Sequence, residues 1–312
     1  MVYTVTFNPA LDYVMNLKSL SADDINRTES EELYYGGKGI NVSAILSQLG
    51  IPNIALGFTA GFTGEKLKEM LDGDGIKNDF VVLKYGFTRI NVKLKYGKEL
   101  DINANGPEIT EEKIDELFSR FKQLKEGDCL VLAGSVPGSL PDDLYSTILR
   151  ELYGRGIRVV VDTTGSQLLN VLPYKPFLIK PNHHELAEIF AQEMDSTEKI
   201  TVYAKKLKEM GAVNVLVSRG GDGAVLVDEE GTVHPAKAVK GKLINSVGCG
   251  DSMVAGFIAG YIKSGDYREA LKLSVASSAA TAFSKKLAQA DEINKIYNNL
   301  GKGNTYAHYQ SA

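Results

Sequence analysis

Residues 244–262 read INSVGCGDSMVAGFIAGYI, a polar, glycine-bearing loop followed by an almost continuous apolar run. The apolar run is about ten residues long, whereas a membrane span needs about 20, so we expect a buried helix that begins near Asp251. The start of such a helix presents bare N–H groups, and Gly248 and Gly250 let a ligand approach them closely. The stretch therefore predicts a site for a phosphate or another small anion.

The composition is that of a globular protein. The chain has 312 residues, of which 44% are hydrophobic and 24% charged, and its net charge of −4 argues against non-specific nucleic-acid binding. The two cysteines form no disulfide framework and the N-terminus lacks signal-peptide features, so we expect a cytoplasmic setting and no membrane partner. The chain carries 31 glycines, about nine more than average usage predicts.

Strand-like apolar runs alternate with helical patterns through most of the chain. The runs are residues 3–7, 54–58, 129–133, 159–162, 177–180, 213–217 and 224–228. Several are continuous rather than alternating, as expected of strands that are covered on both faces. The alternation predicts an α/β fold with a mostly parallel sheet and helices on both sides.

Two stretches break this alternation, at residues 12–35 and 88–103. In the second, Ile90, Val92 and Leu94 alternate with polar residues, which predicts an antiparallel, half-exposed strand. We expect both stretches to form a small β-sheet lid. The predicted α/β domain comprises residues 1–11, 36–87 and 104–300. The predicted lid comprises residues 12–35 and 88–103. Residues 301–312 form a tail that we leave out of the fold.

Four loops hold much of the glycine surplus, at residues 36–41, 133–138, 218–223 and 246–251. Any one of them could be an ordinary turn, but four together favour a phosphate-rich ligand. A Walker A loop is absent, because the residue that should be its first glycine is Glu32. A dinucleotide fingerprint fails at Met253, which argues against a nicotinamide dehydrogenase.

Asp251 has two interpretations. A carboxylate in the first turn can simply cap the helix. It can also take a proton from a substrate hydroxyl, while the N–H groups of Gly248, Cys249 and Gly250 hold the charge on a transferring phosphoryl group. A helix N-terminus can also lower the pKa of a thiol, which would make Cys249 sensitive to oxidation.

The G-x-G-D pattern at 248–251, together with G-G-K-G-x-N at 36–41, resembles that of the PfkB (ribokinase-like) carbohydrate kinases. The resemblance runs from Thr4 to about Leu300, and TVTFNPALD at 4–12 and TRINV at 88–92 resemble the sugar-phosphate branch. It implies a ribokinase-like three-layer α/β/α fold with a small lid. It also implies an enzyme that uses ATP and Mg²⁺, with a monovalent cation such as K⁺ as a further candidate.

The implied reaction converts D-fructose 1-phosphate to fructose 1,6-bisphosphate. Tagatose 6-phosphate and fructose 6-phosphate remain alternatives, because a ketohexose furanose carries a CH₂O arm at each end and can bind turned end for end. A catalytically silent sugar-phosphate sensor is the non-enzyme alternative. It is disfavoured because both Asp251 and Glu185 are present.

The resemblance implies a role for each matching residue. Asp251 would be the catalytic base, and Gly248, Cys249 and Gly250 the anion hole. Asp12, Gly37 and Asn41 would bind the sugar. The residues expected to contact the nucleotide are Lys180, Asn182, Ser218, Gly220, Gly223, Ser246 and Val247. Glu185 and Asp162 would hold the metal through water.

The sugar's own phosphate requires local positive charge. Arginine offers it a planar fork and lysine a point charge, and the candidates are Lys38, Arg89 and Arg27. The edges of a β lid also invite pairing between subunits, so we expect a homodimer through the lid.

Overall fold

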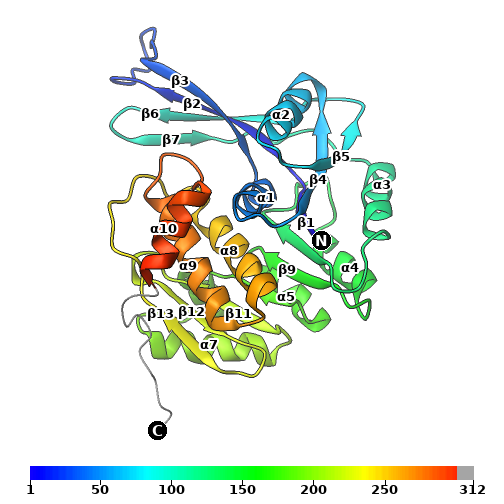
Figure 1. Ribbon diagram of the computed structural model, residues 1–312. Coiled ribbons are helices and arrows are strands. Elements are labelled where there is room, and N and C mark those ends of the chain that lie inside the picture. Colours follow the sequence, from blue (N-terminus) through cyan, green and yellow to red (C-terminus); the bar gives the residue numbers. More distant parts are fainter. Residues whose placement is uncertain (301–312) are drawn as a thin grey trace.

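The predicted strands lie side by side in one nine-stranded sheet of the computed structural model, which describes residues 1–300 (Figure 1). In spatial order they are β13 (Val233–Ala236), β12 (Ala224–Val227), β11 (Asn214–Ser218), β10 (Leu178–Ile179), β9 (Arg158–Asp162), β8 (Cys129–Ala133), β1 (Val2–Thr6), β4 (Asn53–Ala60) and β5 (Asn78–Leu83). All neighbours pair in parallel except β11–β12 and β12–β13. The mostly parallel sheet is thus confirmed.

Helices cover both faces of this sheet. One face carries α1 (Lys38–Gln48), α2 (Gly61–Gly73), α8 (Cys249–Ser264), α9 (Tyr267–Ala282) and α10 (Ala290–Leu300). The other carries α3 (Glu111–Phe121), α4 (Leu144–Leu152), α5 (Gly165–Val171), α6 (His183–Phe190) and α7 (Thr197–Glu209). Short 3₁₀ turns occupy Leu172–Tyr174 and Gly220–Asp222. This is the three-layer α/β/α arrangement.

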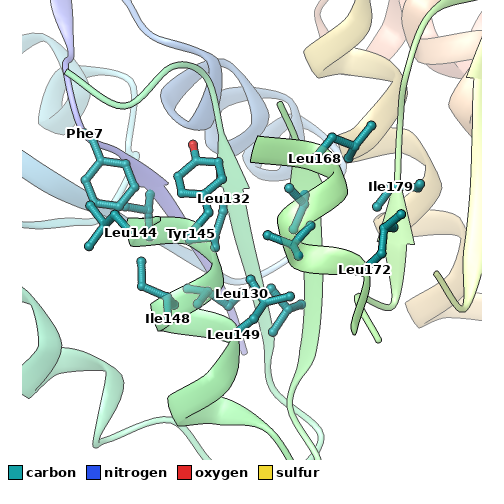
Figure 2. Packing of buried hydrophobic residues seen from close by; sticks show 14 of the residues in the cluster. Phe7, Leu130, Leu132, Leu144, Tyr145, Ile148, Leu149, Leu168, Leu172 and Ile179 are labelled. Atoms are coloured by element: carbon teal, nitrogen blue, oxygen red, sulfur yellow. The ribbon is translucent and has the colours of Figure 1, made fainter. Parts of the chain in front are cut away.

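Strand β8 shows why the strands read as continuous apolar runs. Its Leu130 and Leu132 belong to the core on one face, beside Tyr145 of α4, and Val131 belongs to the core on the other (Figure 2). Every residue of β8 is buried. A strand with two covered faces has no polar side, so its sequence does not alternate.

A second, four-stranded sheet projects from the larger one (Figure 1). Its order is β3 (Ser30–Gly36), β2 (Ala10–Asn16), β6 (Arg89–Lys95) and β7 (Glu99–Ile102). We call it the lid sheet. Strand β6 pairs antiparallel with β7 but parallel with β2, so the predicted antiparallel pairing is correct on one side only.

The two faces of the lid sheet differ in character. The register places Asp12 beside Asn91 on one face, and Tyr13 beside Val92 on the other. Asn91 is only 7% exposed, whereas the neighbouring Ile90 is 36% exposed. The half-exposed strand is therefore confirmed, but its polar side faces inward and its apolar side faces outward.

Some boundaries differ from prediction. Strand β10 spans two residues rather than four, although the backbone N–H groups of Phe177 and Lys180 still donate to the carbonyl oxygens of Val159 and Val161 in β9. The edge strand β5 and the terminal β13 were not predicted. Residues 301–312, the predicted tail, lie outside the described residues. Within residues 1–300, none of the helices is both apolar and long enough to cross a membrane.

Candidate active site

The loop before α8 is shaped by glycine. Gly248 caps the helix with φ +79°, a left-handed conformation that favours glycine. A Cβ atom at this position would also lie 2.5 Å from Cδ2 of Leu287. The turn brings Asp251 into the first turn of α8, where its side chain is buried.

Asn41 joins the two glycine motifs. Its Nδ2 donates to Oδ2 of Asp251 at 2.8 Å across 210 residues of sequence. Asn41 lies in the first turn of α1, whose start packs closely on β1, because a Cβ on Gly39 would lie 2.6 Å from the carbonyl oxygen of Val5. Gly37 has φ +123°, so it too occupies a conformation that favours glycine.

A cluster of charges surrounds the end of β9. Asp162 is 1% exposed and forms ion pairs with Lys38 Nζ at 3.5 Å and Lys180 Nζ at 3.3 Å. A Cβ on Gly250 would lie 3.3 Å from Lys180 Nζ, so this ammonium sits against the loop before α8. Lys180 therefore lies at the loop that was predicted to bind an anion, and Lys38 pairs with the same carboxylate as Lys180.

The carboxyl of Asp251 titrates in an unusual range. Burial, and then the charge of Asp162, raise its pKa to about 6. The hydrogen bond from Asn41 and the charges of Lys38 and Lys180 oppose this rise. At neutral pH the group is mostly ionised yet more basic than a surface carboxylate, as a general base should be.

The pKa values of two neighbouring side chains, Lys38 and Cys249, are also shifted. Burial alone would lower the pKa of the Lys38 ammonium, but nearby carboxylates raise it, and they belong to Asp162, Asp251 and Glu185. Burial, and then the charge of Asp251, raise the pKa of the Cys249 thiol to about 11. The expected lowering of this pKa is wrong, because burial beside a carboxylate outweighs the helix N-terminus.

The expected nucleotide residues gather at the ends of adjacent strands. Asn182 and Ser218 form a parallel bridge that continues β10 and β11, and Gly220 and Gly223 flank the turn that follows. Asn182 and Glu185 form a capping box at the start of α6, with hydrogen bonds of 2.8 and 2.9 Å.

The acidic groups fit a metal held through water. Among residues 1–300, no group of three or more His, Cys, Asp or Glu side chains could hold a metal ion. Mg²⁺ on a nucleotide keeps several waters and needs only one or two carboxylates. Asp162 is a buried carboxylate whose two oxygens face the ammonium groups of Lys38 and Lys180, so a metal held through water would share it with these lysines. Glu185 commits Oε2 to the capping box.

A cleft of about 800 Å³ separates the polar face of the lid sheet from α1 and two loops. Asp12 and Asn41 line it, as do Ser246 and Val247, which were predicted to contact the nucleotide. The loops span residues 243–247 and 285–289. Lys286 from the second loop lies 4.9 Å from the ring centre of Tyr34, which connects this loop to the lid sheet.

The three candidates for the sugar's phosphate are in different places. Lys38 points to Asp162, as described. Arg89, half-buried at the start of β6, donates to the carbonyl oxygens of Asn8 and Ala104, each at 3.2 Å. Arg27 is exposed in the connection between β2 and β3 and does not line the cleft.

One polar residue of the site was not predicted. Asn91 donates from Nδ2 to Oδ1 of Asp12 at 2.8 Å. Its signal in the sequence is the alternation of residues 88–96, which separates two faces of a strand without saying which one is buried.

Comparison with known proteins identifies the family of this chain. Residues 5–294 match the family described as pfkB family carbohydrate kinase. A 1-phosphofructokinase from Bacillus subtilis is 46% identical over 296 residues, covering 95% of this chain and 97% of that protein. A D-tagatose-1-phosphate kinase from Bacillus licheniformis is 38% identical over 296 residues, with the same two shares.

A solved structure has the same fold. Phosphofructokinase-2 from Escherichia coli, in complex with substrates and products, superposes with a TM-score of 0.90 at 27% identity, covering 96% of this chain and 99% of that one. The same E. coli protein has been solved in complex with potassium and in a tetrameric inhibited form. The ribokinase-like fold is thus confirmed.

Proposed function

Since this chain belongs to the pfkB family of carbohydrate kinases, we propose that it transfers the γ-phosphoryl group of ATP to D-fructose 1-phosphate. The products are fructose 1,6-bisphosphate and ADP. The observation that carries the proposal is the buried Asp251, bonded to Asn41 beside a glycine loop and two lysines. The relatives named for ketose 1-phosphates, which match nearly the whole chain, support the acceptor.

Asp251 acts as the general base. Asn41 occupies its Oδ2, which leaves Oδ1 to take the proton from the C6 hydroxyl of the sugar. The C6 oxygen bonds to the γ-phosphorus as the bond from that phosphorus to the β,γ-bridging oxygen breaks, and ADP leaves. Burial raises the basicity of the carboxylate and so favours the proton transfer.

The surrounding groups hold the charge of the transferring phosphoryl group. The backbone N–H groups of Gly248, Cys249 and Gly250 point from the start of α8, and Lys180 lies against this loop. The phosphates and base of ATP lie on the nucleotide residues, which are Lys180, Asn182, Ser218, Gly220, Gly223, Ser246 and Val247. When bound through water to Asp162 and Glu185, Mg²⁺ neutralises phosphate charge.

The sugar binds between the lid sheet and α1, on Asp12, Gly37 and Asn41. Arg89 and Lys38 remain the proposed ligands of the 1-phosphate, although neither side chain lines the cleft. Arg27 does not line the cleft of its own chain. It contributes only if a second subunit brings its lid to this site.

The lid sheet supports a homodimer. Its outer face is almost entirely apolar, and several of its side chains are exposed, among them Leu33, Ile90, Leu100 and Ile102. A face of this kind is stable in water when it packs on another apolar surface, and a second copy of the lid offers one. Residues 12–35 and 88–103 then act as lid and as interface. The cytoplasmic setting and a K⁺ requirement stay predictions.

D-Tagatose 1-phosphate is a second candidate, because a relative with that name matches as much of the chain. It differs from fructose 1-phosphate only in the configuration at C4. Both carry phosphate on C1 and a free hydroxyl on C6, so the same base and the same phosphate ligands serve them.

The test is ADP release from ATP with a panel of ketose phosphates. We expect fructose 1-phosphate to give the highest kcat/KM, followed by tagatose 1-phosphate, with the 6-phosphates well below. A 6-phosphate as the best substrate would overturn the proposed acceptor. No ADP release above background with any of them would overturn the kinase itself.

A further inference from the structure

Asn91 lies at the centre of the lid sheet, on its polar face. It belongs to β6, one of the two inner strands, directly beside Asp12 of β2. Its side chain is 7% exposed. An amide that is buried this far from water requires hydrogen-bond partners, and its partners therefore indicate what it does.

One half of the amide holds Asp12. Nδ2 of Asn91 donates to Oδ1 of Asp12 at 2.8 Å, a short hydrogen bond to a charged group. Gly36 confines the same carboxylate from the neighbouring strand, since a Cβ there would lie 2.8–2.9 Å from its atoms. The carboxylate is thus fixed in one orientation, with Oδ2 left for a ligand at the edge of the cleft.

The other half of the amide has no partner. Oδ1 of Asn91 is buried without a hydrogen bond within the part of the chain that the structure describes. Exchanging the nitrogen and oxygen of the amide would be unfavourable, because it would place the amide oxygen against the carboxylate of Asp12. A donor from outside the chain would satisfy this buried acceptor, which lies beside the carboxylate proposed to bind the sugar.

We propose that Asn91 is a positioning and specificity-determining residue that, with Asp12, binds two ring hydroxyls of the ketose phosphate. Asp12 accepts one hydroxyl on Oδ2, and Asn91 accepts a neighbouring hydroxyl on Oδ1. A pair of fixed acceptors distinguishes sugars by the configuration of those hydroxyls. This rests on the proposed function, and it assigns to Asn91 the discrimination between fructose and tagatose 1-phosphates.

The first test is Asn91→Ala, with kcat/KM measured for both 1-phosphates and KM for ATP. We expect kcat/KM for the preferred sugar to fall about tenfold to a hundredfold, and the ratio between the two sugars to fall toward one, with KM for ATP unchanged. Asn16→Ala is the control, since Asn16 also lies on the lid sheet and loses only an exposed bond to Ser30. A merely structural role would lower both rates together, and an unchanged ratio would overturn the inference.

A second variant keeps the test decisive if Asn91→Ala fails to fold. Asn91→Asp places a carboxyl group against that of Asp12, and such pairs share one proton at low pH. At each pH we compare the variant with wild-type protein, because the sugar phosphate itself titrates near pH 6. We expect calorimetric binding of fructose 1-phosphate by Asn91→Asp to be far weaker than that of wild type at pH 8, and the difference to shrink at pH 5. Binding at pH 8 equal to wild type would contradict the inference. If wild-type protein binds and phosphorylates no ketose phosphate, the proposed function fails instead.

Discussion

In the proposed mechanism a single carboxylate, that of Asp251, accepts the proton, and its burial as an ion lowers the stability of the fold. Its proton-accepting role predicts that Asp251→Asn lowers kcat by several orders of magnitude while ATP still binds, because Asn keeps the bond from Asn41 but cannot take a proton. Steady-state kinetics and calorimetric ATP binding measure the two effects. Turnover within tenfold of wild type would remove Asp251 from its role.

The raised pKa of Asp251 sets a pH dependence with a definite sign. The base must be ionised, so kcat/KM should fall as pH drops through about 6. The folded-state pKa also lies above the unfolded one, so ionised Asp251 destabilises the fold above about pH 4 and fully so above pH 6. Asp251→Asn should therefore be more stable than wild type at pH 8, by roughly 1–3 kcal/mol.

Denaturant unfolding at two pH values checks this. The contribution of the Asp251 charge to the stability difference between Asp251→Asn and wild type should be largest near pH 8 and vanish below about pH 3, where the wild-type carboxyl is protonated in both states. A variant less stable than wild type at pH 8 would show that Asp251 contributes to the fold rather than opposing it.

At the scale of elements, the position of the active site depends on how closely α8 and α9 approach. A Cβ on Gly256 of α8 would lie 2.6 Å from the carbonyl oxygen of Leu273 in α9. Gly256→Ala should push the helices apart and lower the free energy of unfolding by about 2 kcal/mol or more, despite alanine's higher helix propensity. Gly73→Ala is the matched control, since nothing lies within 4 Å of a Cβ there.

Thermal and denaturant unfolding compare these two alanines. We expect Gly73→Ala to be neutral or slightly stabilising, and Gly256→Ala also to lower kcat, because α8 carries Asp251. Equal stability of the two variants would mean that the helices can separate without penalty.

The elements also show what a sequence can and cannot predict. The start of α8 was predictable, because an apolar run of this length after a glycine-bearing loop is typical of a buried helix. The orientation of β6 was not, because alternation separates two faces, and only the packing of β2 decides that Asn91 faces inward. The predicted direction of the pKa shift of Cys249 was wrong for a similar reason, because the burial of its thiol depends on segments that are distant in sequence.

At the scale of the whole molecule, the outer face of the lid sheet predicts the assembly. Ile102 of β7 is 55% exposed on this face, and Ile102→Lys should convert a homodimer into a monomer by burying a charge in the interface. Ile262→Lys is the control, because Ile262 is 48% exposed at the far end of α8. Light scattering after gel filtration gives the masses. A dimer that persists in Ile102→Lys would place the interface elsewhere.

The central claim is that this chain phosphorylates a ketose 1-phosphate on its C6 hydroxyl. The most direct measurement is ³¹P NMR of wild-type protein with ATP, Mg²⁺ and fructose 1-phosphate. We predict that two sugar phosphate signals, on C1 and C6 of one product, grow as ATP is converted to ADP. Growth of free phosphate with the sugar unchanged, or a spectrum that does not change, would contradict the account.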